Sequence, residues 1–495
     1  MFITGRAGTG KSTLLEYFRS ETRKKIAVLA PTGVAALNVK GQTIHSFFGF
    51  KPDITVSKVR KEYKGRDRKG LYKSLDALII DEISMVRADL LDCVDEFLRL
   101  NGKSKDKPFG GVQMIFVGDL YQLPPVVTGQ ERKIFQTVYE TPYFFSAGVF
   151  ERFDFDLLEL EKIYRQTDGV FIGILNAVRN RSITDEHLAT LNVRHNPSFT
   201  PPAGDFYIQL TTTNNKAAQI NGEELHKLKS KLRTFQGIIR GEFDRKQFPT
   251  DVELHVKIGA QVMLVNNDRE GRWVNGSVGK IVDIEKGEDS EEDIIWVELS
   301  EREIVDVAPY TWEVFRLSFD QKTNRLESET IGSFTQYPII LAWAVTIHKS
   351  QGKTFDKVII DMDRGAFAHG QTYVALSRCT TLEGMVLKQP IKKSHILLDW
   401  KVVKFLTQFQ YKKADREISL EERIGIIKKA IQEKGKLTIV YLKGSDEKSK
   451  RVIKPTFLGE LEYMDKTFLG IEAFDFLRNE ERVFRVDRIL TLETA

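Results

Sequence analysis

Short apolar stretches alternate with amphipathic segments through most of the chain. The first four are predicted to be buried strands, at Met1–Thr4, Lys25–Ala30, Ala77–Ile80 and Val112–Val117. Helical patterns separate them, and this alternation predicts a parallel sheet with helices on both faces. A second sheet of the same kind is predicted from further apolar stretches at Phe206–Thr211, Ile339–Val345 and Lys357–Asp361. The pattern indicates an α/β protein with two such domains, at residues 1–150 and at 151–235 with 335–411.

The pattern changes within the second domain. Residues 236–334 carry short β patterns separated by turn signals, at Gln261–Val265, Ser277–Ile284 and Ile294–Leu299. We expect a small β-barrel inserted into the α/β domain. The acidic run Glu288–Asp293 is expected to cap a hairpin there as solvated surface.

Beyond a polar linker at residues 412–423, a helical pattern leads into β-rich sequence. This change predicts a small separate domain at residues 421–495.

The composition is that of a globular protein, with 41% hydrophobic and 29% charged residues. A net charge of +5 is too small to indicate nucleic-acid binding by itself. Cys93 and Cys379 lack metal-ligand spacing and are expected to be reduced thiols. The sequence has no run of 18 apolar residues and no signal peptide before its first motif, so we expect a cytoplasmic protein without membrane contact.

Residues 5–12 (GRAGTGKS) fit the pattern G-x4-G-K-[ST] between a predicted strand and a predicted helix. Small residues allow backbone N–H groups to curl around phosphates, and the N-terminus of the helix favours negative charge. Lys11 is predicted to reach the β- and γ-phosphates and Ser12 to ligate Mg²⁺. The remaining predicted phosphate contacts of this turn are Gly5, Gly8, Thr9, Gly10 and Thr13.

A second motif, Asp81-Glu82, directly follows the apolar strand Ala77–Ile80. Such a strand would deliver Asp81 to the Mg²⁺ shell and place Glu82 where it polarises an attacking water. Together with the glycine-rich turn, the pair predicts nucleotide hydrolysis rather than binding alone.

Several further segments resemble motifs of the Pif-type helicases, the RecD-like group of superfamily 1B. They are Ala30–Ala36, Thr43–Ser46, Pro108–Gln113, Gly118–Pro125, Lys162–Gln166, Ala344–Gly352 and Tyr373–Arg378. The resemblance covers residues 1 to about 400, with the motifs in the family's order. It implies two RecA-like domains that hold ATP between them, and a monomeric motor that moves 5′ to 3′ on single-stranded DNA and unwinds forked or structured DNA.

The resemblance also implies roles for individual residues. Gln122 would sense the γ-phosphate, and Gly352 would lie beside the phosphates. Arg165 and Arg378, expected to come from the second domain, would neutralise transition-state charge when the cleft closes.

Contacts with DNA are implied in the same way. The single strand would run along Thr32, His45, Thr346, His348 and Lys349. Phe109 and Tyr121 are predicted either to stack on bases or to pack in the core.

Eight basic residues lie between residues 58 and 73, namely Lys58, Arg60, Lys61, Lys64, Arg66, Arg68, Lys69 and Lys73. They are either a solvated surface or, as their position implies, a strand-separating wedge (domain 1B, near residues 52–73). In the second case Arg60, Lys61 and Lys64 would hold DNA phosphates. The insert, with Gly271–Gly279, resembles the family's SH3-like domain 2B.

Residues 421–495 resemble a WYL domain, a small Sm-like β module, and the combination indicates a bacterial protein acting at the nucleoid. Arg451, Arg482 and Arg488 are candidates for a basic binding face, and the alternative is a fold-stabilising set of Arg–Asp pairs.

One feature of the resemblance is missing. Family members carry, before the first strand, a segment whose Gln reads adenine, and here the turn begins at Gly5, so the choice of adenine is left open. Two other hypotheses also stay open at this point. One is an ATP-switched DNA-binding regulator, and the other is a motor of opposite polarity.

Overall fold

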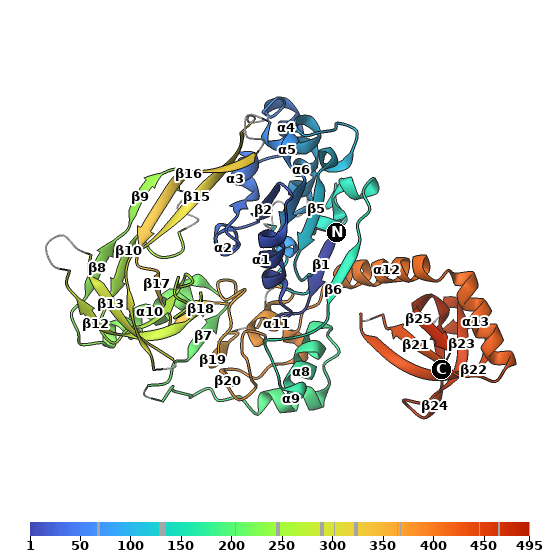
Figure 1. The fold of residues 1–495 in the computed structure, drawn as a ribbon. Coiled ribbons are helices and arrows are strands. Elements are labelled where there is room, and N and C mark those ends of the chain that lie inside the picture. Colours follow the sequence, from blue (N-terminus) through green and yellow to red (C-terminus); the bar gives the residue numbers. More distant parts are fainter. Residues whose placement is uncertain are drawn as a thin grey trace. The chain divides into compact units, whose positions relative to one another are not determined.

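The computed structural model describes residues 1–66, 70–127, 135–202, 204–243, 248–287, 292–300, 302–320, 325–363, 365–366, 368–444, 446–463 and 466–494. The chain forms two compact units (Figure 1). Residues 1–179 and 183–397 make the first, and residues 180–182 and 398–495 make the second. Arg68, Lys69 and residues 288–291 of the acidic run lie outside the described residues.

The first sheet of unit 1 is parallel, with the strand order β3-β2-β4-β5-β1-β6. Its strands are β1 (Phe2–Gly5), β2 (Ile26–Ala30), β3 (Gln42–Thr43), β4 (Ala77–Ile80), β5 (Gln113–Val117) and β6 (Leu157–Leu160). All four strands expected in this region are confirmed. Because β6 pairs with β1, the sheet continues past the boundary predicted at residue 150.

The helices of this α/β domain connect its strands. They are α1 (Lys11–Glu21), α2 (Gly33–Asn38), α3 (Ile44–Phe48), α4 (Val56–Glu62), α5 (Leu71–Ser74) and α6 (Ala88–Asn101). Thr32 caps α2, since its Oγ1 accepts a hydrogen bond from Ala35 N–H at 3.2 Å.

The second sheet is also parallel, with the order β18-β7-β19-β20. Its strands are β7 (Ile208–Thr211), β18 (Ala344–Thr346), β19 (Val358–Asp361) and β20 (Met385–Leu387). The helices of this part of the chain are α8 (Gly169–Arg179), α9 (Asp185–Asn192), α10 (Asn214–Lys227) and α11 (Gln371–Leu376). Its apolar core includes Ala7 and Leu123 of the first domain, so the two α/β domains share buried contacts.

The stretch Ile339–Val345, expected as one strand, is two strands in different sheets. β17 (Ile339–Leu341) pairs with the insert, whereas β18 pairs with β7. The change of partner falls at Ala342 and Trp343, where Ala342 N–H donates to Gln261 O and Trp343 O accepts from Gln209 N–H. A continuous apolar run is compatible with either arrangement, so hydrophobicity alone does not reveal the switch.

The insert is an all-β domain between α10 and β18. It consists of the sheets β14-β13-β12-β11-β17, β15-β16-β9 and β10-β8. The bounds are β8 (Arg233–Gln236), β9 (Ile238–Gly241), β10 (Glu253–Val256), β11 (Gln261–Leu264), β12 (Val278–Glu285), β13 (Ile294–Leu299), β14 (Ile304–Val307), β15 (Tyr310–Asp320) and β16 (Arg325–Gln336). The domain is therefore longer at both ends than residues 236–334. The hairpin β15–β16 extends from it to the first α/β domain, where β15 contacts α5 and β3 (Figure 1).

The described residues of unit 2 include the helices α12 and α13 and an antiparallel sheet of order β24-β23-β22-β21-β25. Its elements are α12 (Trp400–Glu417), α13 (Leu420–Gln432), β21 (Leu437–Leu442), β22 (Lys448–Tyr463), β23 (Lys466–Asp475), β24 (Glu480–Arg485) and β25 (Ile489–Thr494). α13 begins at a capping box formed by Ser419 and Glu422. Ile427 on this helix packs against the apolar face of the sheet.

Arg451 does not lie on a basic face. Its side chain is 5% exposed and is paired with Asp475, which is 0% exposed. The structure therefore favours the fold-stabilising alternative for this residue. Arg482 is exposed and pairs with Glu480 at 3.2 Å, and Arg488 is half-buried.

None of the described helices is both long enough and apolar enough to cross a membrane.

The Asp475–Arg451 pair gives a test of the fold. Asp475→Ala leaves a buried guanidinium without its carboxylate, which costs about 3–5 kcal/mol of stability. We expect amide hydrogen exchange in β22 and β23 of the full chain to accelerate by roughly the corresponding factor of 10² or more. Glu480→Ala, which removes an exposed pair, should leave the exchange rates nearly unchanged. Equal exchange in both variants would contradict a structural role for the buried pair.

Candidate functional site

The glycine-rich turn lies between β1 and α1. Gly8 and Gly10 adopt left-handed φ values of 79° and 82°, which glycine reaches without a steric penalty. Lys11 begins α1, and its Nζ donates to Gly5 O at 2.7 Å and to Arg6 O at 3.0 Å. Burial lowers the pKa of Lys11, and the nearby carboxylate of Asp119 opposes that shift. The turn thus holds one cation at its centre, as a phosphate-binding turn requires.

The acidic pair stands at the end of β4, the third strand in the sheet order. Asp81 is buried, and Glu82 has a left-handed backbone with φ 49° and ψ 43°. Burial and the negative charge of Asp81 raise the pKa of Glu82 to about 7. Strained backbone and a shifted pKa at one residue are typical of a functional site.

The connection between the two α/β domains packs directly on the turn. Tyr164 N–H donates to Gly8 O at 2.8 Å. A Cβ atom at Gly8 would lie 2.4 Å from the Cβ of Arg165, so this approach requires glycine. From α11, the Oη of Tyr373 accepts a hydrogen bond from Ala7 N–H at 2.9 Å.

The two predicted arginines lie near each other but differ in origin. Arg378 follows α11 in the second domain, as expected. Arg165 lies on the connection between β6 and α8 rather than inside that domain. Its Nη1 donates to Ser377 O at 3.2 Å, next to Arg378 in sequence.

Arg378 is buried with 1% exposure, and backbone carbonyls hold it in place. Its Nε donates to Val374 O at 2.9 Å and its Nη1 to Lys353 O at 3.2 Å. Burial and the positive charge of Arg165 lower the pKa of Arg378 to about 9. An anion placed beside the two guanidinium groups would therefore be strongly favoured.

Gln351 joins residues of both domains and was not among the predicted site residues. Its Nε2 donates to Glu82 Oε2 at 3.1 Å and to Gln122 Oε1 at 3.4 Å. The only signal in the sequence is its position inside the segment Ala344–Gly352. Gly352, predicted beside the phosphates, follows it with φ 78°.

A buried ion pair between Arg179 of α8 and Asp119 was also not predicted from the sequence. Arg179 Nη2 lies 3.3 Å from Asp119 Oδ1, and its guanidinium carbon lies 3.9 Å above the ring of Tyr121. Asp119 in turn accepts from Gln122 Nε2 at 3.4 Å, which orients the predicted γ-phosphate sensor. Tyr121 is buried, so its ring packs in the protein rather than stacking on a base.

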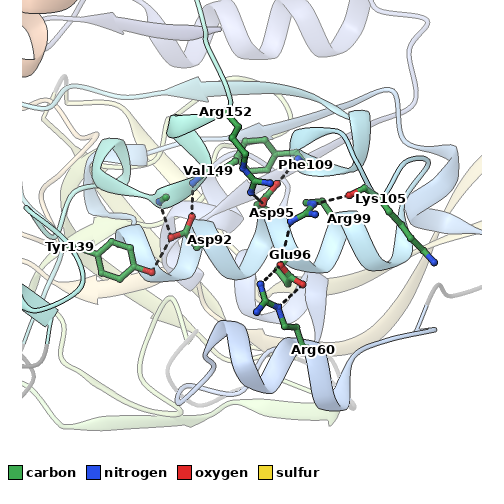
Figure 2. A network of polar contacts seen from close by, with 11 residues as sticks. Arg60, Asp92, Asp95, Glu96, Arg99, Lys105, Phe109, Tyr139, Val149 and Arg152 are labelled. Atoms are coloured by element: carbon green, nitrogen blue, oxygen red, sulfur yellow. Dashed lines mark hydrogen bonds and ion pairs between the residues drawn. The ribbon is translucent and has the colours of Figure 1, made fainter.

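Base stacking by Phe109 is also contradicted. Phe109 is 0% exposed, and its ring packs edge-on against Phe153 at 5.2 Å and Phe116 at 6.3 Å. Its backbone N–H donates to Asp95 of α6 at 2.6 Å (Figure 2). Phe109 and Gly110 are therefore fixed in the core, and the Phe109 ring is not free to stack on a base.

The acidic side chains of α6 hold three neighbouring segments (Figure 2). Asp92 accepts from Val149 N–H and from Tyr139 Oη, both at 3.0 Å. Glu96 accepts from Arg60 Nε at 2.9 Å and from Arg60 Nη2 at 3.2 Å.

The guanidinium of Arg60 is thus engaged by Glu96, and it ties the predicted wedge helix α4 to α6. This bidentate pair gives Arg60 a structural role. The Arg60 side chain is still 62% exposed, and its phosphate contact stays a prediction. Lys61 and Lys64 are exposed.

The remaining predicted DNA contacts vary in exposure. Thr32 and Lys349 are exposed, and His45 and His348 are half-buried with pKa values lowered by burial. Thr346 is buried, and its Oγ1 accepts from Lys349 N–H at 3.3 Å. The contacts of these residues with single-stranded DNA stay predictions.

These features are typical of a P-loop nucleotide hydrolase. The glycine-rich turn and the Asp-Glu pair follow strands of one parallel sheet, and an arginine comes from a second α/β domain. The sequence profile described as PIF1-like helicase matches residues 1–186, and the WYL domain profile matches residues 422–494. The chain belongs to the PIF1-like helicase family.

Relatives and solved structures agree with this assignment. The ATP-dependent DNA helicase Pif1 of Bdellovibrio bacteriovorus is 32% identical, over 83% of this chain and 88% of that protein. The human PIF1 helicase is 34% identical over 78% of this chain. Pif1 from Bacteroides sp. in complex with ADP-AlF4 is 38% identical over 83% of this chain and 93% of the other, with a TM-score of 0.73. The chain spans 60% of the Emericella nidulans relative and 57% of the human one.

The raised pKa of Glu82 predicts a pH dependence. A general base acts only when it is deprotonated, and the pH dependence of kcat/KM reports the pKa of the base in the free enzyme. We therefore expect kcat/KM for ATP to fall about tenfold per pH unit below pH 7. Glu82→Gln should lower kcat by roughly 10²–10⁴-fold and remove that limb. Steady-state hydrolysis between about pH 5.5 and 8.5 measures both effects. A wild-type profile that is flat across this range would show that Glu82 is not the titrating base.

Proposed function

We propose that this protein is an ATP-dependent DNA helicase that moves 5′ to 3′ on single-stranded DNA and unwinds forked or structured duplexes. One observation carries the proposal. Gln351 and Arg378 of the second α/β domain reach Glu82, and the charge of Glu82 acts on Lys11 of the glycine-rich turn. Hydrolysis at that turn is thereby linked to the relative position of two domains, which is what a motor needs. Names of the relatives support the substrate, and solved Bacteroides Pif1 structures include one bound to single-stranded DNA.

The residues fit ATP with Mg²⁺. Mg²⁺ takes hard oxygen ligands, usually one or two from protein and the rest from phosphates and water. The Ser12 hydroxyl and the buried Asp81 carboxylate are such donors, and no cluster of three or more potential metal ligands occurs among the described residues. Bound Mg²⁺ would neutralise phosphate charge. The turn of Gly5, Gly8, Thr9, Gly10 and Thr13 would cradle the phosphates together with Gly352.

In hydrolysis, Glu82 would accept the proton of the attacking water. Gln122 and Gln351 would orient that water. Lys11 would turn from its backbone acceptors to the β- and γ-phosphates. Arg165 and Arg378 would stabilise charge in the transition state, where such arginines act most strongly. Burial and the repulsion from Arg165 lower the pKa of Arg378, and the charge of a bound phosphate would offset that repulsion.

DNA would contact residues from both α/β domains. Thr32 and His45 would hold it on the first, and Thr346, His348 and Lys349 on the second. Lys61 and Lys64 of the wedge would hold phosphates at the fork, while Arg60 keeps the wedge in position. We propose the monomer as the stepping unit. A solved structure, 37% identical with a TM-score of 0.59, describes two coordinating Pif1 helicases at forked DNA.

The accessory modules would assist the motor. We assign the insert to the SH3-like class and the tail to the Sm-like WYL class. Arg482 and Arg488 are the tail arginines left to contact a nucleic acid or ligand. We propose that the protein is bacterial and works in the cytoplasm on nucleoid DNA.

The proposal is tested by unwinding partial duplexes with a 5′ or a 3′ single-stranded tail. We expect unwinding of 5′-tailed substrates only, with ATP hydrolysis stimulated by single-stranded DNA. Lys11→Ala removes the phosphate-binding ammonium and should abolish both activities without changing the circular dichroism spectrum. Unwinding from 3′ tails alone would overturn the polarity. Stimulated hydrolysis without any unwinding would instead indicate a translocating remodeller.

A further inference from the structure

The loop between β11 and β12 is built as a rigid support. Arg272 Nε donates to Asp268 Oδ2 at 2.9 Å, and Arg272 Nη1 donates to Asp306 Oδ1 at 2.6 Å. Trp273 is buried, and its Nε1 donates to Asn266 Oδ1 at 3.1 Å. These contacts fix both ends of the loop within the insert, so a side chain at its tip moves together with the whole insert.

Asn275 is that side chain. Its Nδ2 donates to Asn38 Oδ1 at 3.0 Å, and its Oδ1 accepts a hydrogen bond from Lys353 Nζ. Asn38 is the last residue of α2 in the first α/β domain, and Lys353 follows Gly352 in the second. A Cβ atom at Gly276 would lie 3.4 Å from the Cβ of Lys353, so the loop also packs on the stem of that lysine. One amide thus joins all three domains of unit 1.

Lys353 continues this connection into the ATP site through its backbone. Its carbonyl accepts from Arg378 Nη1 at 3.2 Å, and its N–H donates to Ser350 O at 3.0 Å. Gln351 lies between Ser350 and Lys353 in the sequence, and its side chain donates to Glu82. A displacement of Asn275 that moves Lys353 therefore moves a backbone acceptor of Arg378 and shifts the turn that carries Gln351.

We propose that Asn275 and Lys353 form a coupling contact through which the inserted β domain sets the position of Arg378 and Gln351. Both are positioning residues and neither touches the reacting atoms. DNA held along α2 acts on the same contact through Asn38, so DNA occupancy is transmitted to the ATP site. This inference rests on the proposed helicase function.

The test uses Asn275→Ala and Lys353→Met, singly and together, in the full chain. Methionine keeps the packed stem of Lys353 and removes the ammonium group. The readout is the ratio of ATP hydrolysis rates with and without a single-stranded oligothymidylate. We expect each variant to lower that ratio by about threefold to tenfold, in the range that residues along a coupling route modulate. The double variant should lose no more than either single one, because both remove the same contact.

A second readout separates coupling from folding. Coupling is reciprocal, so saturating ADP-AlF4 should change the affinity for single-stranded DNA less in the variants than in the wild type. Asn275→Asp keeps an acceptor for Lys353 and loses the donor to Asn38, and we expect it to lie between wild type and Asn275→Ala. Val274→Ala changes a neighbouring residue that is 63% exposed and should behave as wild type.

Several results would overturn the coupling contact. They are ratios equal to wild type in both single variants, an equal loss in Val274→Ala, or losses that multiply in the double variant. Failure of the proposed function is distinguishable, because it would show in the wild-type protein itself, as missing stimulation by DNA or as missing unwinding of 5′-tailed duplexes.

Discussion

The close approach of the interdomain connection to the glycine-rich turn is the constraint on which the rest of the site depends. Gly8 lacks a side chain, and this allows the backbone of Tyr164 and the stem of Arg165 to pack directly on the turn. Any larger residue at Gly8 would push the connection away. The arginine, the turn and the start of the second domain are therefore positioned relative to one another by one steric condition.

The two neighbouring guanidinium groups of the site, those of Arg165 and Arg378, favour a phosphate ligand. Burial raises the pKa of Glu82 to about 7 and lowers the pKa of Arg378 to about 9. In both groups, burial disfavours the charged form. Arg165 adds to the lowering at Arg378, since the two cations repel each other. A bound polyphosphate supplies the negative charge that the two guanidinium groups require.

The sequence was informative where function resides in contiguous residues. The turn around Lys11 and the pair Asp81-Glu82 were predictable because a strand and its following residues define each motif locally. Partners that are distant along the chain were not predictable. Arg60 was expected to contact DNA because its neighbours are basic, and only the fold brings Glu96 to it from α6.

The same reasoning explains the other differences. A buried aromatic and a base-stacking aromatic have the same sequence pattern, so the burial of Phe109 appears only when Phe116 and Phe153 surround it. The pairing of Arg451 with Asp475 depends on neighbouring strands β22 and β23, 24 residues apart in sequence. The contacts of Gln351 with Glu82 and Gln122 depend on the packing of two domains, which the sequence does not reveal.

In the proposed mechanism, Arg165 on the interdomain connection completes the ATP site. Single-turnover hydrolysis and nucleotide binding in Arg165→Ala, with single-stranded DNA at saturation, test this role. We expect a loss of hydrolysis rate of at least about 10³-fold, as for other arginine fingers, with ATP affinity changed by only a few-fold. A rate within about threefold of the wild type, measured with the same ATP affinity, would contradict it.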